Sequence, residues 1–318
     1  MNQRFWLAIT SGPPASPWPG QIVVGPVVIG SGSTLDVRAG VGPDTRMDEN
    51  SYLTAQSYLL SGETIPAGER WAGIPAAPAG RAPAPPALPG GAHELSPALH
   101  GAVLIGAKLL LTALAVLPLA LAAVLYAWAE EVDTVAATGW LLHPTVSADQ
   151  FLVSALVAVL IVPALLVSRC YSMRALGKIP EGVVSRWSFT YLRVLLKRDV
   201  LDWANDWLNG TLFWRVWLRG AGMKIARDTE LSTIFDTVPE LVELGSGTFF
   251  ADGIYLGAPL VHRGTVTLAR TKLGNGVFLG NYAVIPIGQT IPDNVLLGVC
   301  TVADDSAIRP GTSWVGEP

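Results

Sequence analysis

The chain has 318 residues, of which 50% are hydrophobic and 14% are charged, whereas about 25% charged residues is usual for soluble domains. This composition excludes a disordered protein and a typical soluble enzyme, and it indicates membrane-embedded segments. The net charge of −4 argues against a nucleic-acid partner. The two cysteines, Cys170 and Cys300, form neither a disulfide framework nor a metal motif, so no metal site is expected.

An internal repeat begins near the N-terminus. From Ile29 to Trp71 every sixth residue is apolar, and a glycine or another turn-forming residue often follows it. A period of six fits neither a helix nor a flat strand, but it is typical of a β-helix in which each short strand points one apolar side chain inward. We therefore expect a partial hexapeptide coil over residues 1–75 and a Pro/Ala/Gly-rich linker over residues 76–100.

Two uncharged apolar segments follow, Leu109–Ala129 and Phe151–Val167. Each is close to the ~20 residues that span a bilayer, so residues 101–172 are predicted to form a transmembrane helical hairpin. A pair of buried core helices is the alternative, but such helices rarely stay apolar on every face. The loop over residues 130–149 is acidic and the segment after the second span is basic, which places the loop outside and both chain ends in the cytoplasm.

Residues 173–222 hold a group of tryptophans interleaved with arginines and lysines. The tryptophans are Trp187, Trp203, Trp207, Trp214 and Trp217. Aromatic and basic residues together could bind nucleic acid in a soluble protein. Directly after a membrane span they predict amphipathic helices that lie in the headgroup region.

The six-residue step returns in residues 223–318. From Leu273 the apolar positions are Leu279, Ile285, Ile291 and Leu297. The repeat is broken between Phe235 and Val242, and again over Gly257–Arg270, which we expect to be a loop thrown out of the coil. Ile29–Leu53 aligns with Leu273–Leu297 without a gap, so the two copies share one register. The predicted fold class is mainly β: one partial and one fuller hexapeptide β-helix coil, joined by a transmembrane α-helical hairpin.

The glycine-punctuated six-residue step resembles the hexapeptide-repeat, left-handed β-helix acyltransferases, and left-handedness is implied by that resemblance. The order of parts is more specific: a coil ending GERWAGIP, a membrane hairpin, then WRVWLRGAGMKIARD entering a coil that ends GTSWVGEP. It resembles the membrane-bound C-terminal region of ε-poly-L-lysine synthetase-like nonribosomal peptide synthetases, in which tandem acyltransferase-like domains alternate with pairs of spans. No adenylation or carrier motif is found and the first coil begins in mid-repeat, so we expect a fragment, a trimmed chain or a companion subunit.

The candidate catalytic residue is His262, in the excursion LGAPLVHRGTV. The resemblance implies a catalytic histidine on such an excursion, where an imidazole with a pKa near ~6.5 takes a proton from the attacking group; a structural loop histidine is the alternative. Asp236 and Asp252 are the candidate carboxylates that orient it, or else solvated acids. The first coil has no histidine from Met1 to Ala92 and is expected to be catalytically silent.

Two arginines of the same excursion, Arg263 and Arg270, are candidates for binding the phosphate of a phosphopantetheine arm, or for capping the loop. The resemblance implies a peptide-bond-forming module that passes a phosphopantetheine-carried aminoacyl thioester to a free amino acid or a growing peptide, with no bound cofactor. Its partners would be the lipid bilayer, adenylation and carrier domains, and an amino acid; an oligomer is compatible with this fold. The alternatives are a CoA-dependent hexapeptide O- or N-acyltransferase and a non-catalytic membrane scaffold. The expected location is the cell membrane, multi-pass, with both coils cytoplasmic.

Overall fold

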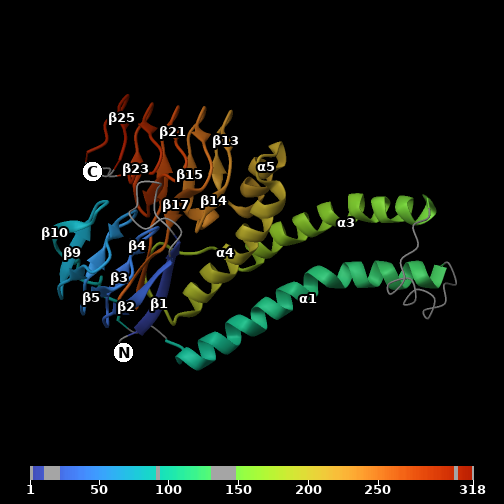
Figure 1. Cartoon of the computed structure of the whole chain (residues 1–318). Helices are drawn as coiled ribbons and strands as arrows, with labels where there is room; N and C mark the ends of the chain where they lie inside the picture. The colour runs from blue at the N-terminus through green and yellow to red at the C-terminus, as the bar shows by residue number, and fades with distance from the viewer. Residues whose placement is uncertain (1–2, 11–21, 91–93, 130–147, 304–306, 317–318) are drawn as a thin grey trace.

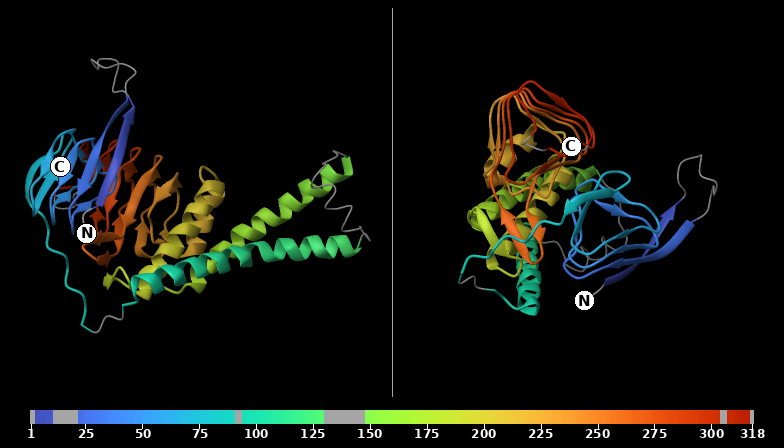
Figure 2. Two further views of the ribbon diagram at one scale, coloured as in Figure 1. Left: turned by 60° about the horizontal axis from the view of Figure 1, so that its bottom comes forward. Right: turned by 90° about the vertical axis from the view of Figure 1, so that its left-hand side faces the viewer.

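The computed structural model describes residues 3–10, 22–90, 94–129, 148–303 and 307–316. Two β bodies lie side by side, and a pair of long helices extends away from them (Figure 1). The first β body comes from the N-terminal part of the chain and the second from the C-terminal part. Viewed from one end, both bodies are coils of short strands (Figure 2, right).

The first coil starts with a hairpin in which β1 (Gln3–Thr10) and β2 (Ile22–Ile29) pair antiparallel. The strands after it pair in parallel three six-residue steps apart, so that Leu35 lies beside Leu53 and Leu53 beside Trp71. These strands are β3 (Thr34–Leu35), β4 (Gly40–Val41), β5 (Thr45–Met47), β6 (Tyr52–Leu53), β7 (Tyr58–Leu59), β8 (Thr64–Ile65) and β9 (Glu69–Ala72). Met47, Leu53, Leu59 and Ile65 are buried together, as the six-residue step predicts.

The first coil extends beyond its expected end at residue 75. Strand β10 (Ala77–Arg81) turns back and pairs antiparallel with β9, so the expected linker starts with a strand. Antiparallel pairing satisfies the backbone groups that the edge strand β9 would otherwise leave open. Residues 82–90 and 94–96 of the linker have no regular secondary structure.

The second coil consists of three parallel sheets, ordered β12-β15-β20-β23, β13-β16-β21-β24-β25 and β14-β17-β22. Its strands are β12 (Lys224–Ile225), β13 (Glu230–Leu231), β14 (Ile234–Phe235), β15 (Val242–Leu244), β16 (Phe249–Phe250), β17 (Ile254–Ala258), β20 (Thr271–Leu273), β21 (Phe278–Leu279), β22 (Val284–Pro286), β23 (Thr290–Ile291), β24 (Leu296–Leu297) and β25 (Ser313–Trp314), with a 3-10 turn at Pro239–Leu241. Leu279 pairs with Leu297 on one sheet, while Ile285 and Ile291 are buried on the other two. The predicted inward series and its stacking are therefore confirmed.

The break over Gly257–Arg270 is an ordered hairpin, which the sequence predicts only as a loop. Strands β18 (Leu260–His262) and β19 (Thr265–Leu268) pair antiparallel, and β11 (Gly182–Ser185) adds a third strand beside β19. The hairpin turns at Arg263 and Gly264, whose φ angles of 44° and 84° are both left-handed. Glycine adopts such a φ at no steric cost, so Gly264 suits this tight turn.

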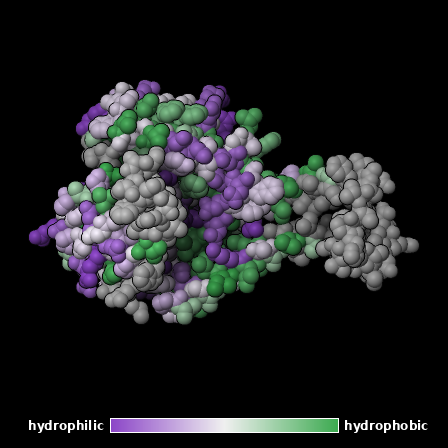
Figure 3. All heavy atoms as spheres, in the orientation of Figure 1, coloured by the Kyte–Doolittle hydropathy of each residue, from purple (hydrophilic) through white to green (hydrophobic). Residues whose placement is uncertain are grey.

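Among the described residues, the helices between the coils are α1 (Pro97–Ala129), α3 (Ala148–Ala175), α4 (Phe189–Leu208) and α5 (Leu212–Ala221). They form a larger share of the structure than the expected mainly β class implies. In the part of the chain that the structure describes, one helix is long and apolar enough to cross a membrane, through its window Pro97–Leu114. Apolar side chains gather along α1 where it leaves the coils (Figure 3). The second expected span lies inside α3, but the side chains of most of its residues, like most of the acidic loop, fall outside the described part of the chain.

Helices α4 and α5 differ from the expected interfacial pair because each buries one face against the second coil. Trp214 and Trp217 are buried; the Trp214 indole donates to the Ser232 carbonyl at 3.0 Å and the Trp217 indole to the Leu166 carbonyl at 2.8 Å. The first turn of a β-helix leaves its apolar interior open, and α5 covers that end. Two of the five tryptophans thus serve the core rather than a membrane surface, while the outer face of α5 exposes Leu212, Phe213 and Val216.

Replacing Ile285 with Asp should destabilise the second coil by several kcal/mol, because it puts an unpaired carboxylate into a wholly apolar interior. Thermal unfolding of the detergent-solubilised chain measures the change. Thr290→Asp is the matched control, since Thr290 is exposed on the next strand and should melt like wild type. An Ile285→Asp variant with the wild-type melting temperature would show that the inward column is assigned wrongly.

Candidate active site

His262 lies at the end of β18, where the excursion of the second coil meets the first coil. Its side chain is buried, with 2% of its surface exposed. Both ring nitrogens have partners from the first half of the chain: Nδ1 lies 2.9 Å from the Thr34 hydroxyl, and Nε2 lies 3.0 Å from the Pro83 carbonyl oxygen. A carbonyl only accepts, so in this arrangement Nε2 carries the hydrogen and Nδ1 accepts from Thr34.

The aromatic ring of Tyr52 packs edge-on against the imidazole, with a centroid separation of 5.5 Å. The Tyr52 hydroxyl donates to Asp36 at 2.5 Å. Burial, reinforced by the Asp36 carboxylate, raises the pKa of Tyr52 well above its ordinary value, so the phenol stays protonated. The first coil thus places a hydroxyl, an aromatic ring and a carboxylate around a histidine of the second coil.

Burial is the main influence on the pKa of His262 and lowers it from its ordinary value. The Pro83 carbonyl and the Asp36 carboxylate act in the opposite direction, while the Arg263 guanidinium lowers the pKa further. The net result is a neutral imidazole at neutral pH. A neutral imidazole is the form that can accept a proton.

The two carboxylates expected to orient His262 lie elsewhere. Asp236 forms an ion pair with Arg198 of α4. Asp252 accepts a hydrogen bond from Ser232 at 3.1 Å, and hydrogen bonds, chiefly from Thr233, lower its pKa. The assignment of either as a partner of His262 is wrong in geometry, because both sit on turns of the coil itself while the hairpin carries His262 away toward the other coil.

The two candidate arginines are engaged by protein groups. Arg263 donates through Nη2 to the Asn50 carbonyl at 2.6 Å and through Nε to the Gly32 carbonyl at 3.3 Å. It thereby fixes the tip of the hairpin to the first coil. Arg270 pairs with Glu181 at 3.1 Å and with Glu243 at 2.8 Å, which ties the base of the hairpin to β11 and β15. These contacts match the alternative in which both arginines hold the excursion in place.

The expectation that the first coil is silent overlooks its part in the site. Thr34 and Tyr52 are neighbours in register on β3 and β6, each one residue before an inward leucine, so both face outward in one column. A second contact region lies farther along, where Gln56 donates to the Tyr282 carbonyl at 2.6 Å and the Arg38 guanidinium lies 4.2 Å from the Tyr282 ring centroid. The six-residue step indicates that Thr34 and Tyr52 point out of the coil, but it does not indicate which residues they contact there.

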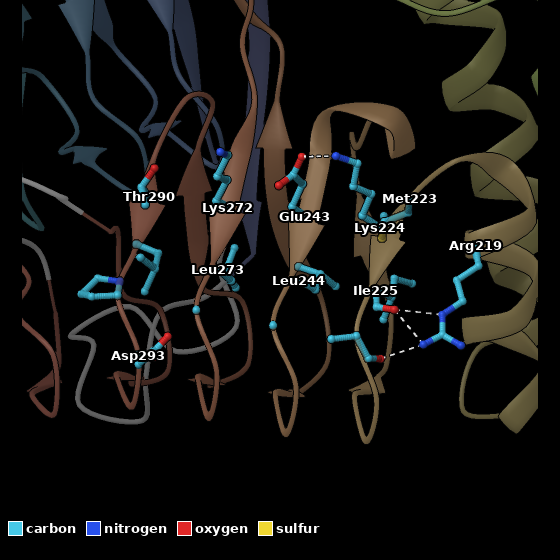
Figure 4. A pocket seen from close by; sticks show the side chains of 15 residues that line it. Arg219, Met223, Lys224, Ile225, Glu243, Leu244, Lys272, Leu273, Thr290 and Asp293 are labelled. Carbon is cyan, nitrogen blue, oxygen red and sulfur yellow. Dashed lines mark hydrogen bonds and ion pairs between the residues drawn. The ribbon is translucent and has the colours of Figure 1, made fainter.

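A cavity of about 750 Å³ lies on the outside of the second coil and does not include His262 (Figure 4). Its floor is the sheet β12-β15-β20-β23, where Lys224 pairs with Glu243 at 2.7 Å. Arg219, at its edge, donates to the Ile225 and Ala226 carbonyls. The lining residues include no histidine or cysteine, so the cavity offers no base or nucleophile of the kind found at the hairpin.

No protein-family model matches the chain. Delta-poly-L-ornithine synthetase of Acinetobacter baumannii (strain AB307-0294) is 34% identical over 148 residues, which are 45% of this chain and 11% of that protein. The chain contains a region similar to a poly-amino-acid synthetase. It matches about a tenth of the length of that synthetase, and the resemblance predicted from the order of coils and helices is confirmed.

Two solved structures are also similar in part. A maltose O-acetyltransferase from Clostridium difficile 630 is 18% identical with a TM-score of 0.33, covering 46% of this chain and 92% of that one. A hexapeptide-repeat-containing acetyltransferase from Vibrio cholerae is 14% identical with a TM-score of 0.31, covering 39% of this chain and 88% of that one. At these scores the fold assignment rests on the strand register of the chain itself.

The imidazole of His262 should titrate below the ordinary value of about 6.5, because burial disfavours its charged form. Its neutral form then contributes to stability above that pH, and the contribution is lost as the pH falls, since the unfolded chain takes up the proton first. Histidine-labelled NMR, with the His262→Gln spectrum for assignment, gives the midpoint. A midpoint above 6.5 would contradict the buried placement.

Proposed function

We propose that the chain is an acyltransferase-like, peptide-bond-forming module of a membrane-bound nonribosomal peptide synthetase. The observation that carries the proposal is the buried, neutral His262 at the contact of two hexapeptide coils, in a chain similar to a poly-ornithine synthetase. The left-handed sense of the coils and the division into residues 1–75, 76–100, 101–172, 173–222 and 223–318 belong to the same proposal, with the first coil extended to Arg81.

The proposed reaction transfers an aminoacyl group from a carrier-bound phosphopantetheine thioester to the amine of a free amino acid or a growing peptide. The nitrogen lone pair attacks the thioester carbonyl carbon, a C–N bond forms and the C–S bond breaks. His262 accepts the proton that the nitrogen loses and returns it to the departing thiolate. To do so Nε2 must present its lone pair, so the hydrogen moves to Nδ1.

Thr34 suits both forms of the imidazole. Its hydroxyl donates to Nδ1 when Nε2 carries the hydrogen and can accept from Nδ1–H when Nε2 is free. The ring is held in one orientation throughout by this bond and by the packing of Tyr52. Arg263, next to His262, is the better placed of the two arginines to meet a phosphopantetheine phosphate, since Arg270 is held by two carboxylates.

The proposed setting is the inner face of a membrane. The apolar window of α1 and its exposed leucines, Leu109 and Leu110 among them, support membrane contact. We infer that α1 and α3 both span the bilayer, with the acidic loop outside and both coils in the cytoplasm. Adenylation and carrier domains supplying the thioester, and a free amino acid as acceptor, are the partners that this reaction requires.

His262→Ala should lower the rate of peptide formation by roughly 10²–10⁴ in the complete synthetase, because it removes the general base. Release of product from a carrier-bound aminoacyl thioester and a free amino acid measures the rate. Asp252→Asn is the matched control: the structure places Asp252 away from His262, so this variant should keep the wild-type rate. Full turnover by His262→Ala would contradict the proposal and favour the alternative in which the chain is a non-catalytic scaffold. Use of acetyl-CoA in place of the carrier thioester would favour the CoA-dependent acyltransferase.

The topology is tested by labelling a cysteine introduced at Thr138, with Cys170 and Cys300 replaced by Ala and Ser. A membrane-impermeant maleimide should label Thr138→Cys in intact cells, because the acidic loop is predicted to lie outside. Thr290→Cys, exposed on the second coil, should react after lysis alone. Labelling of Thr138→Cys that needs lysis would overturn the orientation.

A further inference from the structure

The described segment between β10 and α1 covers the imidazole of His262. This strap, defined as Ala82–Gly90, leaves the first coil and passes the second coil's hairpin on its way to α1 (Figure 2, right). Its Pro83 carbonyl oxygen occupies the hydrogen-bonding position of Nε2, at 3.0 Å. With Nδ1 bonded to Thr34 and 2% of the side chain exposed, neither nitrogen of His262 can receive a substrate while the strap is in place.

The strap is lightly attached. The Ala82 amide donates to the Gly68 carbonyl at 2.9 Å, which fixes the upstream end to the first coil. Beyond it, most residues of the strap are exposed, Pro83 among them. Four of its nine positions are proline, at 83, 85, 86 and 89, and proline has no backbone N–H to donate. A segment with so few donors and so little buried surface opens at low free-energy cost.

The downstream end connects the strap to a helix with an apolar surface. The Leu95 amide donates to the Trp187 carbonyl at 3.0 Å, and α1 begins two residues later at Pro97. His100, in the first turns of α1, packs edge-on against the Trp187 ring at 5.6 Å. The strap therefore leaves the coil that positions His262, and the chain after it leads to the helix that we infer to enter the bilayer.

We propose that the strap is a lid over His262 and that the Pro83 carbonyl stands where the attacking amine of the acceptor must stand. This inference rests on the proposed function and names the place of the acceptor in that site. When the lid is closed, Nε2–H donates to the carbonyl and the imidazole has no free lone pair at Nε2. When it lifts, the space beside Tyr52 and Thr34 becomes available to an amine. The hydrogen of the imidazole then moves to Nδ1, which donates a hydrogen bond to the Thr34 hydroxyl.

The experiment measures how fast diethyl pyrocarbonate modifies His262, by mass spectrometry of the peptide. Because the contact is made by a backbone carbonyl, the lid is loosened by inserting Gly-Ser-Gly-Ser after Pro86 rather than by a side-chain change. The same insertion after Thr138 is the matched control. An exposed reporter, Thr290→His, is present in every chain and corrects for consumed reagent.

We expect the insertion after Pro86 to raise the modification of His262 relative to the reporter about tenfold, and the control insertion to leave it unchanged. Adding L-ornithine to the loosened chain should protect His262, while the reporter keeps its rate. Equal modification in wild type and loosened chain overturns the lid, and absence of protection overturns the placement of the acceptor. If the insertion exposes His262 but His262→Ala retains peptide formation, the proposed function alone is refuted. If His262→Ala abolishes peptide formation but the insertion leaves the modification of His262 unchanged, the lid alone is refuted.

Discussion

The parallel register of three six-residue steps per turn is the constraint on which this structure depends. Each step gives the interior one apolar side chain, and each turn places the next strand beside the last. A coil built in this way cannot hold a long insertion in its wall. The residues added between Gly257 and Arg270 therefore leave the wall as a hairpin, and the hairpin carries His262 to a surface that the coil could not reach by itself.

The hairpin is held at its base and at its tip by two arginine side chains, which bind carboxylates and backbone carbonyls of the protein. Arg270 draws its base onto the carboxylates of Glu181 and Glu243, and Arg263 fixes its tip to backbone carbonyls of the first coil. Between these two points the imidazole is buried against Tyr52 and Thr34. Side-chain contacts thus hold the excursion in place, although its sequence has no repeat.

The coils and their inward residues could be predicted from the sequence because a single physical rule, one buried apolar residue per step, repeats without interruption from Ile29 to Trp71 and from Leu273 to Leu297. Leu53, Leu59, Ile65, Leu279 and Leu297 follow that rule, and all are buried. His262 could be singled out because the interruption contains it. The partners of His262 could not be found, because no periodicity relates Thr34, Asp36 or Pro83 to a hairpin more than 170 positions away. For the same reason the sequence favours Asp236 and Asp252, which are nearer to His262 in the chain, and it places the tryptophans of α5 at a membrane surface rather than at the open end of a coil.

The bond between Thr34 and His262 joins residues that are 228 positions apart, and the described part of the chain between them includes the helices α1, α3, α4 and α5. Contacts of such high sequence separation form late, after the local elements on each side have folded. The imidazole therefore acquires its orienting hydroxyl after the second coil has been synthesised and docked on the first. A nascent or half-assembled chain has no oriented imidazole, so the reaction that we propose requires both coils to be synthesised and docked first.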